Sequence, residues 1–392
     1  MSKRIVILGG GYGGLICART VRTHLSSQQA AITIVNRHPE HQIVTELHRL
    51  AAGNVSQHAV SLPLDRLLKR KNIDVKIGDV SSIDIQGGKV RMDSGDSCEY
   101  DVLVLALGSE TNYFGIPGLK ENSFSLKSVA DANRIHAHLE QQILQFKMMG
   151  DSSDATFVVG GGGLSGVELI GEFADELPGI CRRHGVSFEV VGLYLIEAMP
   201  TILPMFPPHL VQRAISSLEA RGVKFLLGCP VTGMRDKAVT LKDGSAIKTG
   251  TFVWTGGVKG NPLVAGCGIE VERGRAKVNP YLQSVSHPSV FLAGDCAVVK
   301  DYNGRPYPPS AQLALQMGRR VGENVAAAVQ GKRMKTFHPQ LGGTLASLGR
   351  KDGIGTIGKR GITLKGTTAS VMKKASNVRY LSSINGLFSL LP

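Results

Sequence analysis

The sequence predicts an α/β fold with two parallel-sheet domains, and two observations lead to this prediction. A G-x-G-x-x-G pattern occurs twice, at residues 9–14 and 161–166, and each copy follows a β-branched run and precedes a helical pattern. In such a loop the first glycine permits a tight turn, the second lets the backbone approach a pyrophosphate, and the third lets the helix pack on the strand. The diphosphate lies at the positive end of the helix. Two copies about one domain apart favour Rossmann-like domains that bind two dinucleotides.

A second duplication lies downstream of each loop. The segment 89–95 leads to a hydrophobic run that ends at Gly108, and the segment 238–244 leads to one that ends at Gly257. When Gly95 is aligned with Gly244, the two terminal glycines also coincide. Each half is therefore predicted to continue with a hairpin that turns at a glycine and a buried strand that ends in one. The alternative is two unrelated α/β units whose glycines match by chance.

The remaining elements follow in chain order. In the first half, residues 5–8 form a strand and a second strand ends at residues 34–37. In the second half, residues 156–159 form the first strand and residues 188–196 the second. Residues 290–293 form one more buried strand, because apolar residues run there without interruption.

The residues that end the second strands indicate which dinucleotide each half binds. Glu197 ends the strand of the second half, where a carboxylate accepts hydrogen bonds from a ribose 2′-hydroxyl and repels a 2′-phosphate. NADH is therefore favoured over NADPH. The first half has Asn36, followed by Arg37, in place of the usual acid, and an asparagine can still bond a ribose.

The composition fits this interpretation and disfavours several classes of function. The 392 residues suffice for two or three domains, and the 48 glycines suit repeated nucleotide turns. Aromatic residues make up only 5%, which disfavours a stacking platform for nucleic acid. The six cysteines show no C-x-x-C and no metal-ligand spacing, so we expect no metal site, no disulfide framework and a reducing compartment. The first strand begins almost at once, so we expect no signal peptide.

The formal net charge of +14 suggests an anionic partner. We find no recognised nucleic-acid module in the sequence, so nucleic acid is not the expected partner. A membrane surface rich in anionic lipid attracts basic residues by about 1 kcal/mol each when they lie close to it. Solubility alone is the alternative explanation of the charge.

The C-terminal segment has the pattern of a helix that lies in a membrane interface. No apolar run in the sequence approaches the roughly 18–20 residues needed to span a bilayer. Apolar residues instead recur at helical spacing, with three basic residues off the stripe. A helix docked on its own domain would give the same periodicity. The stripe comprises Val371, Ala375, Val378, Leu381, Ile384, Phe388 and Leu391, and the basic residues are Lys373, Lys374 and Arg379.

Over essentially its whole length the chain resembles the type II NADH:quinone oxidoreductases, which are single-chain flavoenzymes of the membrane surface. The resemblance rests on residues 9–14 (GGGYGG), 161–168 (GGGLSGVE), 253–258 (VWTGGV), 291–296 (FLAGDC) and 311–316 (AQLALQ). The first motifs belong to the wider superfamily of flavoproteins that bind two dinucleotides. The A-Q-x-A-x-Q pattern is far more specific to the quinone reductases.

By this resemblance the first loop binds FAD non-covalently and the second binds NADH. Asp295 would hydrogen-bond the ribityl chain, although an Asp that closes a strand can instead cap a helix. Thr45 would lie near the isoalloxazine, and its neighbours Glu46 and Arg49 depart from the apolar and acidic residues expected there. The implied FAD residues are Gly9, Gly10, Gly11, Tyr12, Gly13, Gly14, Asn36, Arg37, Thr45, Val80, Leu107, Asp295, Ala311, Gln312 and Lys373, and the implied NADH residues are Gly161, Gly163, Gly166, Glu197 and Gly257.

Gln312 and Gln316 are the predicted quinone-binding residues. They lie four apart, so on a helix both amides project from one face. Paired amides can donate to the carbonyl oxygens of a quinone, and two solvent-facing glutamines are the alternative. Lys373 matches a family position that reaches back to this region, and a solvated lysine is its alternative.

The resemblance implies that NADH delivers a hydride to the flavin, which passes two electrons to a membrane quinone without proton pumping. Glu168 and Glu172 lie four apart on the helix after the NADH loop. Glu168 matches the catalytic acid of the family, and we expect this carboxylate to position the nicotinamide or relay protons towards the quinone, with Glu172 facing the same site. Capping or salt bridging is the structural alternative for either residue.

The implied architecture has an FAD-binding domain of residues 1–112 and 260–335, an inserted NADH-binding domain of residues 113–259, and a membrane- and quinone-facing region of residues 336–392. The expected location is peripheral, at the cytoplasmic face of the cell membrane, and a homodimer stays open. Two other functions would keep both loops: a soluble NADH-dependent reductase of a ferredoxin or rubredoxin partner, and a non-enzymatic FAD/NADH redox sensor. Disulfide reductases and sulfide:quinone reductases are disfavoured, because no cysteine lies near Thr45.

Overall fold

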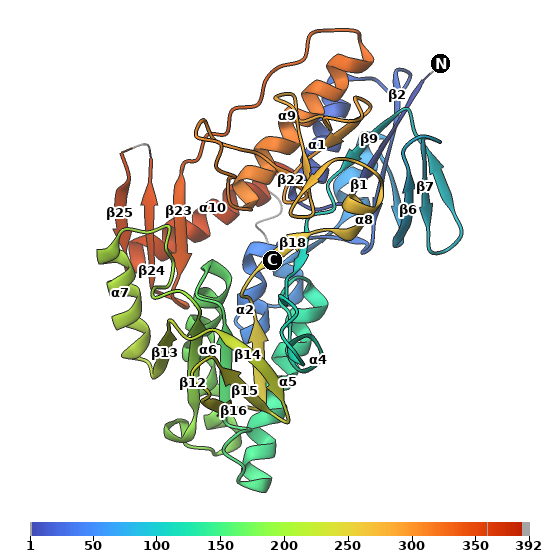
Figure 1. Ribbon diagram of the computed structural model, residues 1–392. Helices are drawn as coiled ribbons and strands as arrows, with labels where there is room; N and C mark the ends of the chain where they lie inside the picture. The colour runs from blue at the N-terminus through green and yellow to red at the C-terminus, as the bar shows by residue number, and fades with distance from the viewer. Residues whose placement is uncertain (1, 359, 386–392) are drawn as a thin grey trace. The chain divides into compact units, whose positions relative to one another are not determined.

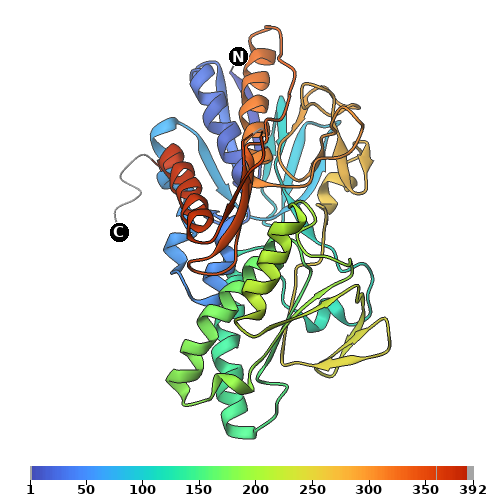
Figure 2. The same cartoon turned by 90° about the vertical axis from the view of Figure 1, so that its left-hand side faces the viewer.

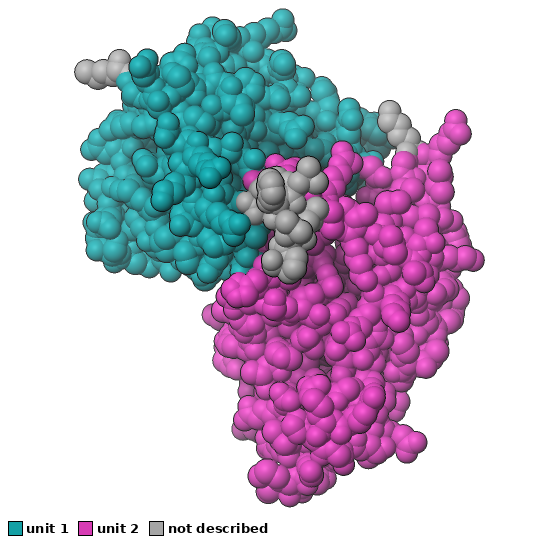
Figure 3. Space-filling view, turned by 180° about the vertical axis from the view of Figure 1, so that it is seen from behind, with its two compact units in different colours: residues 1–42, 61–110, 258–341 teal, residues 43–60, 111–257, 342–392 magenta. Residues whose placement is uncertain are grey.

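A computed structural model describes residues 2–358 and 360–385 of the protein. The chain forms two compact units, which Figure 3 shows in different colours. The first unit contains residues 1–42, 61–110 and 258–341, and the second contains residues 43–60, 111–257 and 342–392. The C-terminal residues from 342 onward therefore belong to the second unit.

The first unit is built on a parallel sheet in the order β21-β9-β1-β2-β5. Strand β1 (Lys3–Leu8) lies at its centre, and every residue of β9 (Val102–Leu105) and β21 (Val290–Leu292) is buried. Parallel strands covered on both faces have such continuous apolar runs. The other two strands are β2 (Ala30–Asn36) and β5 (Asp74–Ile77).

Helices α1 (Tyr12–His24) and α9 (Ala311–Val329) of this unit lie side by side (Figures 1 and 2). A glycine permits this approach, because a Cβ at Gly318 would lie 2.3 Å from the carbonyl oxygen of Gly13. The helix with the A-Q-x-A-x-Q motif is thereby packed directly on the helix that follows the first glycine loop.

Smaller elements complete the first unit. Gly95 has a φ of +88° and turns the hairpin between β7 and β8, as the glycine pattern predicts. These elements are β3 (Glu40–Gln42), β4 (Ser61–Pro63), α3 (Leu64–Leu68), β6 (Val80–Asp84), β7 (Lys89–Met92), β8 (Ser97–Glu99), β18 (Val258–Gly260), α8 (Pro262–Gly266), β19 (Val271–Glu272), β20 (Arg275–Lys277) and β22 (Ala297–Val298), with β10 (Ser109–Thr111) where the chain leaves the unit.

The second unit repeats this plan with a parallel sheet in the order β13-β12-β11-β17 and an antiparallel sheet of β14, β15 and β16. Gly244 has a φ of +85° and turns the hairpin between β15 and β16. The two parallel sheets confirm the predicted α/β fold class. The elements are β11 (Thr156–Gly160), β12 (Gly192–Glu197), β13 (Val223–Leu227), β14 (Val231–Arg235), β15 (Ala238–Leu241), β16 (Ala246–Lys248), β17 (Thr251–Trp254), α2 (Leu47–Ala52), α4 (Leu119–Asn122), α5 (Val129–Met149), α6 (Leu164–His184) and α7 (Pro208–Glu219).

The strand predicted over residues 188–196 is shorter than expected. Residues Phe188–Val190 form a 3₁₀ turn, and β12 begins only at Gly192. The hydroxyl of Ser187 accepts a hydrogen bond from the backbone N–H of Glu189 at 3.3 Å, and this cap starts the turn. Local capping therefore overrides the β propensity of the valines that follow.

The last part of the second unit is an antiparallel sheet followed by α10 (Thr367–Asn385). The sheet consists of β23 (Gly343–Ser347), β24 (Gly353–Ile357) and β25 (Ile362–Lys365), and α10 packs on all three strands. Ser370, Tyr380 and Ile384 of the helix are buried. Among the described residues no helix is long and apolar enough to cross a bilayer.

The apolar stripe predicted for this helix contains both exposed and buried residues. Val371 and Val378 are 57% and 42% exposed, whereas Ile384 is buried. Part of the stripe therefore remains exposed. Phe388 and Leu391 lie outside the described residues.

Lys373 and Lys374, which the sequence predicts to attract anionic lipid, both have partners within the second unit. Lys373 forms an ion pair with Glu168, and the Nζ of Lys374 donates to the carbonyl of Arg350 at 2.8 Å. Both ammonium groups are engaged within their own unit, because the docked face of α10 runs over the buried Glu168 and the turn after β23.

Candidate functional site

The first glycine loop has the geometry that a diphosphate needs. Gly9 has a φ of +105°, and a Cβ at Gly14 would lie 1.9 Å from the carbonyl oxygen of Gly9. A Cβ at Gly11 would meet no protein atom within 4 Å. Gly11 begins α1 without a side-chain cap, so side chains do not satisfy the N–H groups of the first turn. These features fit the diphosphate of FAD.

The second loop, in the other unit, has the same geometry. Gly161 has a φ of +110°, a Cβ at Gly166 would lie 1.9 Å from the carbonyl oxygen of Gly161, and a Cβ at Gly163 would meet nothing within 4 Å. Gly163 begins α6, again without a side-chain cap. The loop therefore fits a second dinucleotide.

The strand-end residues Asn36 and Glu197 make equivalent bonds to their loops. The Oδ1 of Asn36 accepts from the N–H of Gly10 at 2.7 Å, and the Oε2 of Glu197 accepts from the N–H of Gly162 at 2.5 Å. The amide of Asn36 also donates to the carbonyl of His38 at 2.7 Å, a bond that a carboxylate could not make. This donor gives a physical reason for the asparagine.

Sequence reasoning missed His41, which is fully buried beneath the first loop. Its Nδ1–H donates to the carbonyl of Gly10 at 2.8 Å, and Tyr12 packs on the ring edge-to-face at 5.4 Å. Burial lowers the pKa of His41 to about 4, so the ring is neutral at pH 7. A lone histidine in strand β3 carries no sequence signal for such a contact.

Asp295 lies in the turn that joins β21 to β22. Its Oδ2 accepts from the hydroxyl of Ser109 at 3.1 Å, and its backbone carbonyl accepts from the Nε of Arg275 at 2.8 Å. No helix begins at this residue, so the capping alternative does not apply. A half-buried carboxylate held at the end of a parallel sheet can accept bonds from a ligand.

The other predicted FAD residues are distributed over both units. Val80 opens β6, Leu107 follows β9, and Ala311 opens α9 behind the N-cap Ser310. In the second unit, Thr45 is exposed and Lys373 lies in α10. The exposed side chain of Arg37 pairs with Asp79.

Gln312 and Gln316 both donate to the backbone carbonyl of Gln340, at 3.4 and 2.9 Å. The Oε1 of Gln316 also accepts from the N–H of Gln340 at 2.8 Å. The two amides therefore lie on one face of α9, as their spacing predicts, and they hold the segment after the helix. Each amide nitrogen has a second N–H that can serve a ligand.

Glu168 is buried at the centre of a polar cluster in the second unit. Its Oε1 accepts from the backbone N–H of Ser347 at 3.0 Å and from the ammonium group of Lys373. Its Oε2 lies 3.6 Å from the Nδ1 of His48. Burial raises the pKa of Glu168, and Lys373 opposes this shift. A buried carboxyl with a raised pKa is a candidate for proton transfer.

Glu172 lies one turn further along α6 and is 1% exposed. Its Oε2 accepts from the amide of Asn54 at 2.7 Å. Burial raises the pKa of Glu172 to about 7, although Asn54 and Arg49 favour the charged form. The carboxyl can therefore gain and lose a proton near neutral pH.

Glu46 and Arg49, which the sequence marks as departures from the family, pair with each other. The Nη1 of Arg49 lies 3.0 Å from the Oε2 of Glu46, and Glu46 is 5% exposed. The two charges thus compensate within α2 and the turn before it.

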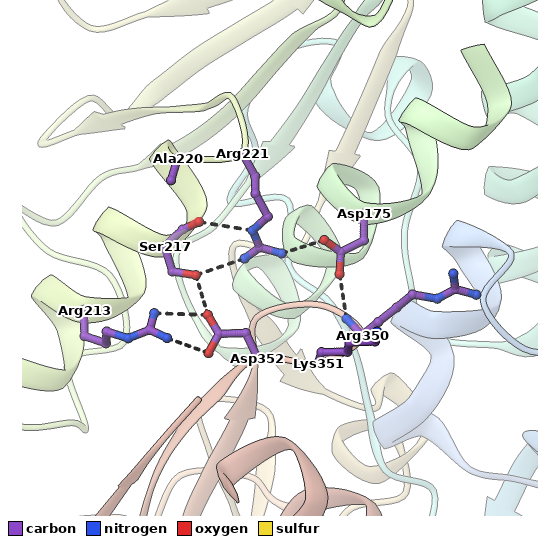
Figure 4. A pocket seen from close by; sticks show the side chains of 8 residues that line it. All are labelled: Asp175, Arg213, Ser217, Ala220, Arg221, Arg350, Lys351 and Asp352. Carbon is purple, nitrogen blue, oxygen red and sulfur yellow. Dashed lines mark hydrogen bonds and ion pairs between the residues drawn. The ribbon is translucent and has the colours of Figure 1, made fainter. Parts of the chain in front are cut away.

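A hollow of about 660 Å³ is lined by residues of α6, of α7 and the segment that follows it, and of the turn between β23 and β24 (Figure 4). Arg213 binds both oxygens of Asp352 at 3.0 and 2.8 Å, and Arg221 lies 2.8 Å from Asp175. Burial alone would raise the pKa of Asp352, but hydrogen bonds from Ser217 and Arg213 hold it below its usual value. The pair of Arg213 and Asp352 fastens the turn to α7, and the backbone N–H of Arg350, which donates to Asp175 at 2.7 Å, fastens it to α6. These contacts fix the strand that presents Ser347 to Glu168.

The cysteines are dispersed single thiols. All six are free, and burial raises the pKa of Cys296, beside Asp295, to about 11. Among the described residues no group of His, Cys, Asp and Glu could hold a metal ion.

The sequence matches known proteins over almost its full length. Residues 3–318 match the family model described as pyridine nucleotide-disulphide oxidoreductase. The chain is 33% identical over 391 residues to a type II NADH:quinone oxidoreductase of Staphylococcus aureus, with 98% of this chain and 96% of that protein covered. The corresponding protein of Staphylococcus saprophyticus is 32% identical over the same shares.

Solved structures of low identity share the fold. NDH2 from Plasmodium falciparum, in complex with NADH, has a TM-score of 0.86 at 16% identity, covering 99% of this chain and 96% of that one. The sulfide:quinone oxidoreductase of Aquifex aeolicus has a TM-score of 0.80 at 20% identity, covering 98% and 92%. These likenesses concern the fold alone.

Proposed function

The chain belongs to the family of type II NADH:quinone oxidoreductases, and from this premise we propose how its own residues transfer two electrons from NADH through FAD to a quinone. The protein is an enzyme and a flavoprotein that pumps no protons. FAD, when bound, takes up the hydride of NADH and passes the electrons to the quinone. The chain binds and orients these molecules and supplies protons.

We assign FAD to residues 1–112 and 260–335. The N–H groups at the start of α1 would bind its diphosphate, and Asn36 would bond its adenosine ribose. Asp295 would accept a hydrogen bond from the ribityl chain, held in place by Ser109. These hydrogen bonds would hold FAD without a covalent link to the protein.

We assign NADH to the second loop, within residues 113–259. The N–H groups at the start of α6 would bind its diphosphate, and Glu197 would bond the ribose 2′-hydroxyl. Gly257 follows β17, and a Cβ there would lie 2.7 Å from the ring of Phe114. A glycine at this position therefore permits the close approach of Phe114.

We assign the quinone to the face of α9 that carries Gln312 and Gln316. Their remaining N–H groups can donate to the two carbonyl oxygens of a quinone ring. Glu168 would supply protons for quinol formation, because its carboxyl is buried beside a lysine and two further polar groups. Glu172, whose pKa is raised to about 7, would exchange protons one turn away on the same helix.

We propose peripheral attachment to the cytoplasmic face of the cell membrane through the C-terminal region, residues 336–392. The exposed Val371 and Val378 of α10 supply apolar contact, and the net charge of +14 favours anionic lipid.

The observation that carries the proposal is the repeated loop, whose two uncapped helix starts fit two dinucleotides in one chain. Purified protein should show a flavin visible spectrum that bleaches when NADH is added under anaerobic conditions. A short water-soluble quinone should restore the spectrum, and NADPH should bleach it far more slowly than NADH.

The same measurement separates the alternatives. Restoration by a ferredoxin or rubredoxin but not by any quinone would indicate a soluble reductase. Bleaching without turnover on either acceptor would indicate a sensor. Properly folded protein that binds no flavin would contradict the proposal as a whole.

A further inference from the structure

A small cavity of about 20 Å³ lies within the second unit beside the ion pair of Glu168 and Lys373. His48, Glu172, Ser347 and Lys373 contribute to its lining. A cavity needs roughly 10–15 Å³ to hold one water molecule, and that molecule needs polar partners. The volume and the lining therefore suit a single water.

Two residues link this cavity to Glu168, and each has a buried polar atom left over. His48 is 3% exposed, and its Nδ1 lies 3.6 Å from the Oε2 of Glu168. Ser347 donates its backbone N–H to the Oε1 of Glu168 at 3.0 Å. The Nε2 of His48 and the Oγ of Ser347 are buried and have no hydrogen-bond partner in the described part of the chain. Because buried polar atoms nearly always have a partner, both atoms point to a bound molecule.

We propose that His48 carries protons to Glu168 from a water molecule held in this cavity by its own Nε2 and the hydroxyl of Ser347. The inference rests on the proposed quinone reductase function, and it names a residue and a bound water that supply the protons. The 3.6 Å separation of Nδ1 and Oε2 is within reach of a small side-chain movement.

The proton transfers balance over one turnover. Reduction of a quinone by NADH takes up one proton from solution. The water gives a proton to the Nε2 of His48 as the Nδ1–H proton passes to the Oε2 of Glu168. Glu172, which lines the same cavity, restores the proton of the water and regains its own from solvent. Glu168 then supplies this proton for quinol formation. Exchange of the neutral imidazole between its two tautomers, through the same water and with no net change in protons, restores the Nδ1–H for the next turnover.

The surroundings keep His48 in the neutral form that such a step requires. Burial, and then the charges of Lys373 and Arg49, lower the pKa of His48 well below its usual value. A neutral imidazole has one nitrogen that donates and one that accepts. The charged groups around the cavity and the ring are Glu46 of the turn before α2, Arg49 of α2, Glu168 and Glu172 of α6, Arg350 after β23, and Lys373 and Lys374 of α10.

The test compares His48→Asn and Ser347→Ala with the matched control His138→Asn. His138 is a partly buried histidine of the same unit, and its ring bonds the carbonyl of Gly250 at 3.0 Å. Stopped-flow spectroscopy follows flavin reduction by NADH and reoxidation by a soluble quinone separately. His48→Asn should slow reoxidation roughly tenfold or more, with reduction changed less than about twofold. Ser347→Ala, which removes one oxygen atom, should slow reoxidation several-fold.

Further readouts distinguish proton transfer from mere packing. The isotope effect of D₂O on reoxidation should change in His48→Asn but not in His138→Asn, and added imidazole should partly restore reoxidation in His48→Ala. If the wild type reduces quinone and both His48→Asn and Ser347→Ala reoxidise their flavin at the wild-type rate, the relay is overturned and the enzyme function is not. A wild type that reduces no quinone would overturn both. Equal loss of both half-reactions would assign His48 to structure alone.

Discussion

The Oε2 of Glu197 accepts a hydrogen bond from the backbone N–H of Gly162 at 2.5 Å. Its Oε1 accepts from the N–H of Met199 at 2.7 Å. The carboxylate that is predicted to recognise the ribose therefore also holds the loop that we assign to the diphosphate. Substitutions at this residue change two properties, which different variants can separate.

Glu197→Gln should retain an acceptor for the loop and lose the negative charge. NADPH should then gain relative to NADH. The stability should fall by about 0.5–1.5 kcal/mol, because the single amide oxygen can serve Gly162 and the N–H of Met199 then loses its bond. Glu197→Ala should lose the loop bond as well, which is worth about 0.5–1.5 kcal/mol, so binding of both nucleotides should weaken. Steady-state kinetics with each nucleotide measures the ratio. Equal use of NADPH and NADH by the wild type would show that Glu197 does not select the nucleotide.

Two glycines of the first loop should respond differently to the same added methyl group. Gly14→Ala places a Cβ 1.9 Å from the carbonyl of Gly9, so the fold itself should lose about 1–3 kcal/mol or more. Gly11→Ala meets no protein atom and should fold normally, yet the methyl group would lie where the diphosphate belongs. We expect Gly11→Ala to have wild-type stability without FAD and weakened FAD binding. Thermal unfolding and flavin titration of both apoproteins test this, and normal FAD affinity in Gly11→Ala would argue against this loop as the site.

Glu172 should make the stability of the protein depend on pH. Its pKa is raised to about 7 in the fold, against an ordinary value of 4.5, so the fold favours the protonated form. The wild type should lose stability as pH rises from about 4.5 to 7, by about 3 kcal/mol in all. Glu172→Gln, which cannot ionise, should match the wild type below this range and exceed it above pH 7. Unfolding at several pH values measures the difference, and a difference that does not vary with pH would refute the assignment.

Gln316→Ala should weaken quinone use without impairing flavin reduction by NADH. The substitution also frees the backbone N–H of Gln340 and leaves its carbonyl with the longer bond from Gln312 at 3.4 Å, so the segment after α9 should become more mobile. Loss of neutral hydrogen bonds of about 0.5–1.5 kcal/mol each predicts a change of several-fold to tens of fold in the quinone requirement. Hydrogen exchange at residues 336–341 separates the structural part from the loss of a quinone contact. Slowed flavin reduction with unchanged reoxidation would place this helix at the NADH site instead.

The glycine loops could be predicted from sequence because their backbone and steric requirements lie within a few consecutive residues. A glycine with positive φ and a glycine without room for a Cβ leave a pattern within six residues, and Gly9 and Gly14 have that geometry. The pairing of Glu168 with Lys373 could not be predicted in this way, since the two residues lie 205 positions apart and meet only when α10 docks. His48 and His41 were missed for the same reason, because burial and not sequence spacing gives them their partners.

The C-terminal helix shows how burial divides a single sequence pattern. An apolar period of about 3.6 residues marks a face but not its surroundings, and here Val371 and Val378 of the stripe are exposed whereas Ile384 is buried. Truncation of the helix would therefore also remove Lys373 from Glu168. A test of membrane attachment should change only the exposed side chains.

Val371→Asp combined with Val378→Asp should release the protein from vesicles of anionic lipid. The two valines are 57% and 42% exposed, so aspartate in their place should fold normally while removing apolar contact and adding charge repulsion. The control is Val285→Asp in the first unit, where the valine is 48% exposed. Flotation with liposomes measures attachment.

Because only part of the attraction is electrostatic, high salt should weaken binding of the wild type to the vesicles without abolishing it. Turnover with a membrane-embedded quinone should fall much more than turnover with a soluble one, whereas continued flotation of the double variant would mean that another surface makes the attachment.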